Sequence, residues 1–342
     1  MRVSSLTWGV LAIPVLLLTI FIGASLGETR IPLDIVLQSL GNKLFDAGYD
    51  IDRIDQGIVW NYRTSRAVVA ACCGAGLAIS GVILQALLRN SLADPYLLGI
   101  SAGASTGAVA VAIMGVGGGL ISMSAGAFGG ALLAFALVAL LAYSAGGGVG
   151  LRAAGIIVLA GIAGSQMFNA LTAFLITKSA SAEQARGITF WLLGNLSGVR
   201  WDDTITAVPA SIFGVLVAYL SARTLDAFTF GADSAASLGI NVKRAQGVLI
   251  TTAALVTAVM VSIAGSIGFV GLVVPHAMRI LFGNRHRRLI PASALGGAIF
   301  LVFADVTSRM LIPGQILPIG VITSLVGAPV FAMILIGGRQ KP

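Results

Sequence analysis

The chain has 342 residues, of which 57% are hydrophobic and only 10% are charged. A soluble domain of this size needs many more polar residues to cover its surface, so the composition excludes a water-soluble globular protein. The apolar runs recur along the whole length and lack the alternation of membrane β-strands. We therefore expect an all-α, polytopic membrane protein with one transmembrane domain over residues 1–342.

Ten apolar segments, separated by short polar breaks, are candidates for membrane-spanning helices. About 20 apolar residues are needed for a helix to cross the hydrocarbon core, and the segments approach or exceed this length. The first segment lacks a small-residue cleavage site, so we expect a retained helix and not a signal peptide. The ten expected spans are residues 8–27, 65–88, 95–115, 120–143, 152–177, 204–223, 246–264, 267–282, 290–311 and 316–337.

The charges between these segments predict an orientation. With a cytoplasmic N-terminus and ten alternating spans, both termini are cytoplasmic. The cytoplasmic ends then carry 12 cations and three acids, a net +9, and the outer ends carry nine cations and ten acids, a net −1, which together give the formal +8 of the chain. This asymmetry follows the positive-inside rule and predicts a multi-pass protein of the inner membrane. The basic balance therefore reflects topology, and we expect no nucleic-acid partner.

A glycine-rich segment, LLGISAGASTGA, places Gly99, Gly103 and Gly107 four residues apart. Glycines at this spacing share one face of a helix and let a second helix approach closely, so we expect a helix–helix contact there. The longest outer segments are residues 28–62 and 178–203. The stretch FWLLGNL in the second is too short to span and is expected to lie along the membrane surface.

Few residues could carry catalysis or bind a metal. No lysine follows a glycine, so a Walker A loop is absent, and His276 and His286 lack the HExxH spacing of a zinc site. The adjacent cysteines Cys72 and Cys73 point to different sides of a helix and are expected to serve in packing. We expect no enzymatic activity, no cofactor and no bound metal.

Asp305 is the only acidic residue well inside an expected span. It precedes Arg309 by four residues, so the two side chains share a helix face and are expected to pair, either to hold the helix end or to serve the substrate. Ionisable residues within the membrane mark ion pathways, and their scarcity argues against an ion-coupled secondary transporter. A permease driven by a separate ATPase needs none of them. A secondary transporter or channel without an ATPase stays open as the alternative class.

Two segments are candidate cytoplasmic surfaces. Residues 226–247, DAFTFGADSAASLGINVKRAQG, have an amphipathic helix–turn–helix pattern centred on Gly239. Residues 275–291, PHAMRILFGNRHRRLIP, are strongly basic. The second segment is explained equally well as a solvated loop that obeys the positive-inside rule.

Three stretches resemble the iron-chelate and cobalamin permeases of type II ABC importers. They are RTSRAVVAACCGAGLAISGVILQALLRNSLADPYLLGISAGAS from residue 63, GSIGFVGLVVPHAMRILFGNRHR from residue 265 and LPIGVITSLVGAPVFAMIL from residue 317. The chain departs from the family pattern at Thr64 and Ser65, which replace Leu-Pro, at Ser91, which replaces Pro, and at Asn284 and Arg285, which replace Asp. Together the stretches cover most of residues 60–337.

The resemblance implies the type II ABC importer permease fold, with about ten transmembrane helices in each subunit of a dimer. It implies an ATPase dimer on the cytoplasmic face, a periplasmic substrate-binding protein on the outer face, and a second permease subunit, most simply a second copy of this chain, in membrane lipid. The ATPase contact would lie between the sixth and seventh helices, at Asp233, Ser237, Leu238, Gly239, Ile240 and Arg244.

Docking of the binding protein is expected, by the same resemblance, at Arg63, Arg66 and Arg309. Arginine suits this role because its planar guanidinium binds carboxylates through two parallel hydrogen bonds. The alternative is that these side chains only anchor helices at the interface.

The resemblance also implies that the fifth and tenth helices line the pathway. Residues 143–152 would form the cytoplasmic gate, at Ser144, Gly146, Gly147 and Gly148. Gln166 and Asn169 lie three apart on the fifth helix and share a face. They could line the pathway or make interhelical hydrogen bonds, and the sequence leaves both interpretations open.

The substrate is expected to be a ferric siderophore, because LADPYLLGISAGAS and FWLLGNLSG look most like that branch of the family. Haem and cobalamin are the alternatives, and some relatives carry oxyanions. Specificity in such importers resides largely in the binding protein.

Overall fold

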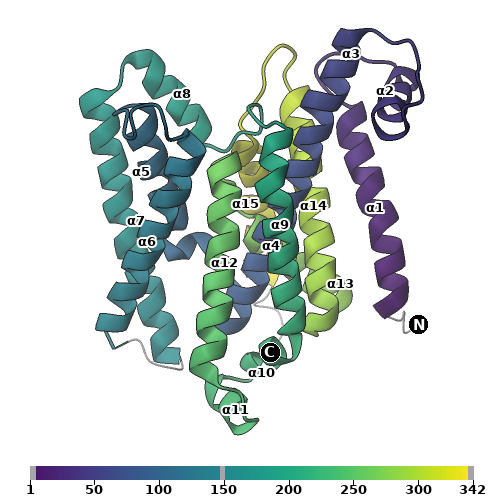
Figure 1. The fold of residues 1–342 in the computed structure, drawn as a ribbon. Coiled ribbons are helices and arrows are strands. Elements are labelled where there is room, and N and C mark those ends of the chain that lie inside the picture. The colour runs from purple at the N-terminus through teal and green to yellow at the C-terminus, as the bar shows by residue number, and fades with distance from the viewer. Residues whose placement is uncertain (1–4, 147–150, 338–342) are drawn as a thin grey trace.

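The computed structural model describes residues 5–146 and 151–337, and these residues are almost entirely helical (Figure 1). Within that part of the chain the extended pairing is one isolated bridge between Ile312 and Gln315. The helices are α1 (Ser5–Ser25), α2 (Leu33–Phe45), α3 (Arg53–Gly57), η1 (Ile58–Thr64), α4 (Ser65–Leu87), η2 (Pro95–Leu98), α5 (Ile100–Ala112), α6 (Met123–Ser144), α7 (Leu151–Ser179), α8 (Ala182–Leu192), α9 (Trp201–Leu220), α10 (Ala222–Thr229), α11 (Ala232–Ser237), α12 (Val242–Ala264), α13 (Val270–Phe282), α14 (His286–Met310) and α15 (Ile319–Gly337).

The structure has an apolar helix at each of the ten expected spans, and six of these helices are confirmed as long and apolar enough to cross a membrane. Four shorter apolar helices occupy the remaining expected ranges. The long ones are Arg53–Leu87, Met123–Ser144, Ala154–Ser179, Trp201–Leu220, Val242–Ala264 and His286–Met310, and the shorter ones are Ala12–Ser25, Ile100–Ala112, Val270–Phe282 and Ile319–Met333. The chain is therefore an all-α, multi-pass membrane protein.

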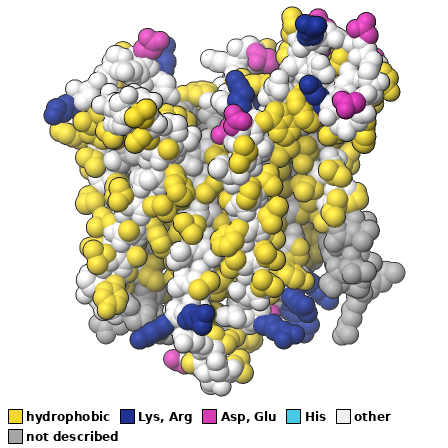
Figure 2. All heavy atoms as spheres, in the orientation of Figure 1, with side chains coloured by type: hydrophobic (Ala, Val, Ile, Leu, Met, Phe, Trp, Pro, Cys, Tyr) yellow, Lys and Arg dark blue, Asp and Glu magenta, His cyan; other side chains and the backbone are white. Residues whose placement is uncertain are grey.

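The two ends of the bundle are polar. Figure 2 shows hydrophobic side chains over the middle of the molecule and charged side chains gathered at its upper and lower edges. We call the edge that carries α2, α3 and α8 the upper edge, and the edge that carries α10 and α11 the lower edge (Figure 1). An apolar belt between two charged rims is the surface that a bilayer requires.

Helix α4 lies at the centre of the bundle. In its most apolar 18-residue stretch, 83% of the residues are buried. Glycines bring its neighbours close: a Cβ on Gly74 would overlap the Gly297 carbonyl of α14, and one on Gly81 would overlap the Gly271 backbone of α13. Backbone-to-backbone contact of this kind is the usual basis of helix association in lipid.

A second glycine contact joins α5 to α6. A Cβ on Gly103 would meet Gly130, and one on Gly107 would meet Gly126, which confirms the expected helix–helix face for these two glycines. Gly99 is different, because it precedes α5 and has a φ of +75°. This left-handed conformation, which glycine adopts without strain, ends the 3₁₀ turn of η2 and delays the start of the helix to Ile100.

The outer segments contain more helix than expected. Residues 28–62 form α2, α3 and the π-helix η1, which runs without a break into α4. FWLLGNL contributes the last turn of α8 and then turns at Gly194, where φ is +83°. Ile188 of α8 contacts Val109 of α5 and Leu175 of α7, so this helix covers the upper edge, as expected.

Candidate functional site

Four charged residues form a buried cluster near the upper edge, which we call the Arg–Asp cluster: Arg63, Arg66, Asp305 and Arg309. Arg63 belongs to η1 and Arg66 to the first turn of α4, whereas Asp305 and Arg309 lie at the end of α14. The close approach of α4 to α14 brings them together from distant parts of the sequence.

Asp305 is the centre of this cluster. Its Oδ1 lies 2.6 Å from Nε of Arg66, and its Oδ2 lies 2.9 Å from Nη2 of Arg309. Asp305 has no exposed surface, and the two arginine side chains are 1% and 2% exposed. The expected pairing of Asp305 with Arg309 is therefore confirmed, and one carboxylate serves two guanidiniums.

Further polar groups hold the arginines in place. Arg66 donates to the Tyr62 hydroxyl at 3.0 Å and to the Ser197 hydroxyl at 3.2 Å. Arg63 donates to the Ser25 carbonyl at 3.0 Å and also to the Thr29 carbonyl. Ser25 is the last residue of α1, where unpaired carbonyls and the helix dipole favour a cation.

The three arginines thus lie inside the protein and not on an open surface, since Arg63 is also only 2% exposed. A cavity of about 180 Å³ reaches two of them, Arg63 and Arg309, and is also lined by Glu28 and Tyr62. Arg309 Nη1 is buried and has no hydrogen-bond partner among the described residues.

The lower edge carries the expected helix–turn–helix. Helix α11 ends at Ser237, and α12 begins after Asn241, whose side chain caps the Arg244 N–H. Gly239 lies at the turn with a φ of +83°, as the sequence pattern predicted. The side chain of Leu238 is 72% exposed beside it. The other predicted contact residues lie on the same protrusion: Asp233, Ser237 and Arg244 are exposed and Ile240 is half-buried.

The start of α14 is fixed to α10 at this edge by a pair that sequence reasoning missed. Asp226 Oδ1 lies 2.7 Å from Nδ1 of His286 and accepts the His286 backbone N–H at 3.0 Å. The residues are 60 positions apart, and neither motif that contains them indicates the partner.

Helix α7 presents the residues expected to line the pathway. Only 11% of its most apolar stretch is buried, and Gln166 and Asn169 are both exposed. Neither side chain makes a hydrogen bond to another described residue, so hydrogen bonding between helices of one chain does not account for them. Ser144 and Gly146, also exposed, lie where α6 ends. Gly147 and Gly148 of the expected gate lie outside the described residues.

The first two motif stretches meet in the core of the bundle. Gln85 of α4 donates to the Gly271 carbonyl at 3.0 Å and accepts a hydrogen bond from Arg279 at 2.5 Å. The Tyr96 hydroxyl donates to the Ile267 carbonyl and accepts the Ile267 N–H. These polar contacts account for the presence of Gln85 and Tyr96 within otherwise apolar segments. The cysteines are free, with Cys73 buried and Cys72 half-buried.

The chain is similar to known permeases along most of its length. The FecCD transport family matches residues 15–337. An uncharacterised ABC transporter permease, YvrB of Bacillus subtilis, is 37% identical over 95% of this chain and 93% of its own. The hemin transport system permease HmuU of Yersinia pestis is 35% identical over 83% of this chain and 84% of its own. The cobalamin import permease BtuC of Halobacterium salinarum is 40% identical over 84% of this chain and 75% of its own.

A solved structure shares the fold. It is described as an inward-facing conformation of an ABC transporter assigned to the metal-chelate type, and it superposes with a TM-score of 0.79 at 27% identity over 95% of this chain and 97% of that chain. With six apolar spans and four shorter apolar helices among its described residues, and a family match that spans residues 15–337, the chain belongs to the FecCD transport family of type II ABC importer permeases.

Proposed function

We propose that this chain is the inner-membrane permease through which an ABC importer carries a ferric siderophore. Relatives at 33–40% identity are named for Fe(3+) dicitrate, hemin and cobalamin transport. The ferric siderophore is chosen because residues 92–105 and 190–198 look most like that branch of the family. Haem and cobalamin are the alternatives.

The exposed polar face of α7 supports a pathway between two subunits. In a single copy, Gln166 and Asn169 would face lipid, which polar side chains in spans avoid. A second copy of this chain placed against α7 would enclose them in a passage. The gate at Ser144, Gly146, Gly147 and Gly148 would close the lower end of that passage, the last two residues being proposed from sequence alone.

The lower edge is proposed to be cytoplasmic and to receive the ATPase dimer. Leu238, Gly239 and Ile240 form the tip of the protrusion between α11 and α12, with Asp233, Ser237 and Arg244 beside them. An exposed leucine within a polar rim is typical of a protein interface. Both termini would then also be cytoplasmic, in agreement with the distribution of charge.

The upper edge is proposed to receive the substrate-binding protein. Three arginines and one aspartate leave the Arg–Asp cluster with a net positive charge, which attracts acidic lobes and speeds encounter. In this structure the cations are buried, so a partner carboxylate would have to enter the 180 Å³ cavity to reach Arg63 and Arg309. There it would bind Nη1 of Arg309, which has no partner among the described residues, while Nη2 stays paired with Asp305.

Uptake by a strain that lacks this gene tests the proposal. Labelled ferric siderophores, haem and cobalamin are offered in parallel, and the wild-type gene is expected to restore siderophore uptake alone. Arg63→Gln is the test variant, because Arg63 lines the cavity and makes no ion pair with Asp305. It should strongly reduce uptake while the protein remains in the membrane, as measured by immunoblot. Arg30→Gln, which removes an exposed charge at the same edge, is the control and should transport normally.

Each contrary result has a definite meaning. Restoration of haem or cobalamin uptake instead would replace the substrate, and unchanged uptake of all three would point to another cargo such as an oxyanion. Normal uptake by Arg63→Gln would exclude docking at Arg63. Uptake that continues after deletion of every associated ATPase gene would favour a secondary transporter.

A further inference from the structure

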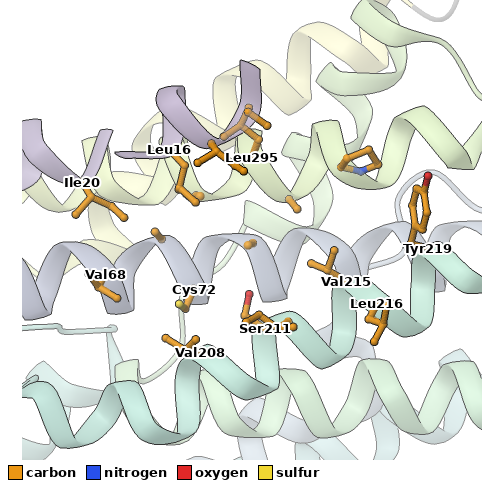
Figure 3. A pocket seen from close by; sticks show the side chains of 18 residues that line it. Leu16, Ile20, Val68, Cys72, Val208, Ser211, Val215, Leu216, Tyr219 and Leu295 are labelled. Atoms are coloured by element: carbon orange, nitrogen blue, oxygen red, sulfur yellow. The ribbon is translucent and has the colours of Figure 1, made fainter. Parts of the chain in front are cut away.

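A second feature, away from the surfaces assigned to transport, is an apolar groove between α1, α4, α9 and α14 (Figure 3). It has a volume of about 570 Å³ and is lined almost wholly by apolar groups. The side chains that line it include Leu16 of α1, Cys72 of α4, Val215 of α9 and Leu295 of α14 (Figure 3). Helices α4, α9 and α14 are apolar spans and α1 is a shorter apolar helix, so the groove faces hydrocarbon and suits an acyl chain.

Along α9 the groove has about the length of one leaflet. Its lining there extends from Val208 to Tyr219, which is 11 steps along the helix, or about 16 Å at 1.5 Å per residue. The hydrocarbon core of a bilayer is about 30 Å thick, so this is about half of it. Tyr219 is next to the end of α9 at the lower edge, so the α9 side of the groove lies in the leaflet on that side. On α4 the lining continues upward to Val68, near the start of that helix.

Basic side chains surround the lower mouth of the groove. Pro291 lines it on α14, and Arg287 and Arg288 precede Pro291 by four and three residues on the same helix face. Arg223 follows Tyr219 by four residues. All three arginines are exposed, and none forms a salt bridge with another described residue. Side chains on a helix lean toward its N-terminus, which carries Arg287 and Arg288 toward the headgroup layer.

The mouth is held in shape by the bond between α10 and α14. Asp226 accepts both the Nδ1 contact and the backbone N–H of His286, so its carboxylate is already engaged. Arg223 and Asp226 belong to α10, while Arg287 follows His286 directly. The pair therefore keeps the basic side chains of the two helices at the same end of the groove.

We propose that the groove binds one anionic phospholipid of the cytoplasmic leaflet. One acyl chain lies against α9 and α14, and the phosphate accepts hydrogen bonds from Arg287 and Arg288. The leaflet assignment rests on the proposed orientation, whereas the site itself does not depend on transport. Any phospholipid chain fits an apolar groove, but only the arginines select the headgroup, because each basic side chain at the surface favours an anionic lipid.

Native mass spectrometry on the delipidated full-length chain tests the headgroup. Dioleoyl phosphatidylglycerol and dioleoyl phosphatidylcholine are added at equal concentration, so that only the headgroup differs. The wild type should retain phosphatidylglycerol more tightly by a factor on the order of ten. Arg287→Gln with Arg288→Gln should remove this preference. Arg285→Gln with Lys243→Gln removes the same charge from exposed positions off the groove and should keep it.

A second measurement tests the chain position. Phosphatidylglycerol with a photoactivatable diazirine in the acyl chain should crosslink to peptides that contain Cys72 or Ser211. Ala294→Phe, which fills the groove, should abolish this crosslink, whereas Leu133→Phe at an exposed site on α6 should not.

Three results would overturn the proposal: equal retention of the two lipids by the wild type, equal loss of preference in the charge-matched control, or crosslinks that Ala294→Phe leaves unchanged. If Ala294→Phe fails to fold, the arginine variants decide. The measurements need neither ATPase nor substrate, so a wrong cargo assignment does not affect them.

Discussion

Asp305 carries its negative charge in the interior, between the side chains of Arg66 and Arg309. The removal of one partner from a buried ion pair leaves the other charge uncompensated, which typically costs about 3–5 kcal/mol. The replacement of the whole group by neutral residues costs much less, because no unpaired charge remains. The Arg–Asp cluster therefore makes the stability of the upper edge depend on a balance of charge.

We predict that Asp305→Asn destabilises the protein by about 3–5 kcal/mol. Thermal unfolding of the detergent-solubilised chain should show a lower Tm, whereas Asp202→Asn, at an exposed acid of the same edge, should not. The triple variant Asp305→Asn, Arg66→Gln and Arg309→Gln should recover much of the loss. A triple variant less stable than Asp305→Asn alone would show that charge compensation is not what holds this cluster.

At the scale of single residues, the sequence predicted one of the two ion pairs that Asp305 makes. Asp305 and Arg309 are four apart, and the helical repeat alone brings them together. Arg66 lies 239 positions from Asp305, and no local pattern indicates that distance. Nor did composition reveal that the arginines at the upper edge are buried, since burial depends on how α1, α4 and α14 meet.

Among the elements, the glycine contacts of α4 decide how closely the helices approach. Gly74 lies against Gly297 and Gly81 against Gly271, so no side chain separates the backbones. A methyl group added at Gly74 or Gly81 would overlap backbone atoms, which cannot move aside as a flexible side chain can. Overfilling a tightly packed interior usually costs about 1–3 kcal/mol, and a rigid backbone obstacle makes relief harder.

Gly74→Ala is therefore expected to lower the Tm and the amount of protein in the membrane. Gly129→Ala on α6 is the matched control, because a Cβ there meets no atom within 4 Å. It should leave both quantities unchanged or slightly raised, since alanine is the better helix former. Equal behaviour of the two variants would mean that α4 and α14 are not in close contact.

Helix positions were predictable from apolar length, and helix starts were not. Helix α13 begins at Val270, three residues after the expected start at 267, because Phe269 takes a φ of +68° that breaks the preceding backbone. The helices α2 and α3 were missed because polar residues interrupt the apolar residues of their segment, which is therefore too short in apolar length to carry a spanning signal. The pattern around Gly239 succeeded because glycine at a helix end is a local signal.

On the scale of the whole molecule, the helices of the bundle differ in how much of their surface is exposed. Helix α4 is buried, whereas α7 is mostly exposed and carries polar side chains. Composition and charge were enough to predict a multi-pass helical protein. The family resemblance then predicted that it is a permease of a type II ABC importer. The cargo could not be predicted from this chain in the same way, because relatives of 33–40% identity are named for different cargoes.

We expect α7 to face its counterpart in a second copy. In a background with Cys72→Ser and Cys73→Ala, Asn169→Cys should form a dimer-sized band with a short bis-maleimide in native membranes. Leu133→Cys, 68% exposed on α6, should remain monomeric. Crosslinks from Leu133 in place of Asn169 would move the interface, and crosslinks only to a different protein would indicate a heterodimer.

The glycine contacts of α4 also limit how the molecule can move. Rotation of α4 about its own axis by one residue would drive a side chain into the carbonyl of Gly297 or Gly271. Helices α4, α13 and α14 are therefore expected to move together as one rigid body. A passage that opens and closes must then do so at contacts that lack such glycine pairs, and α7 is the least buried of the described spans within one chain.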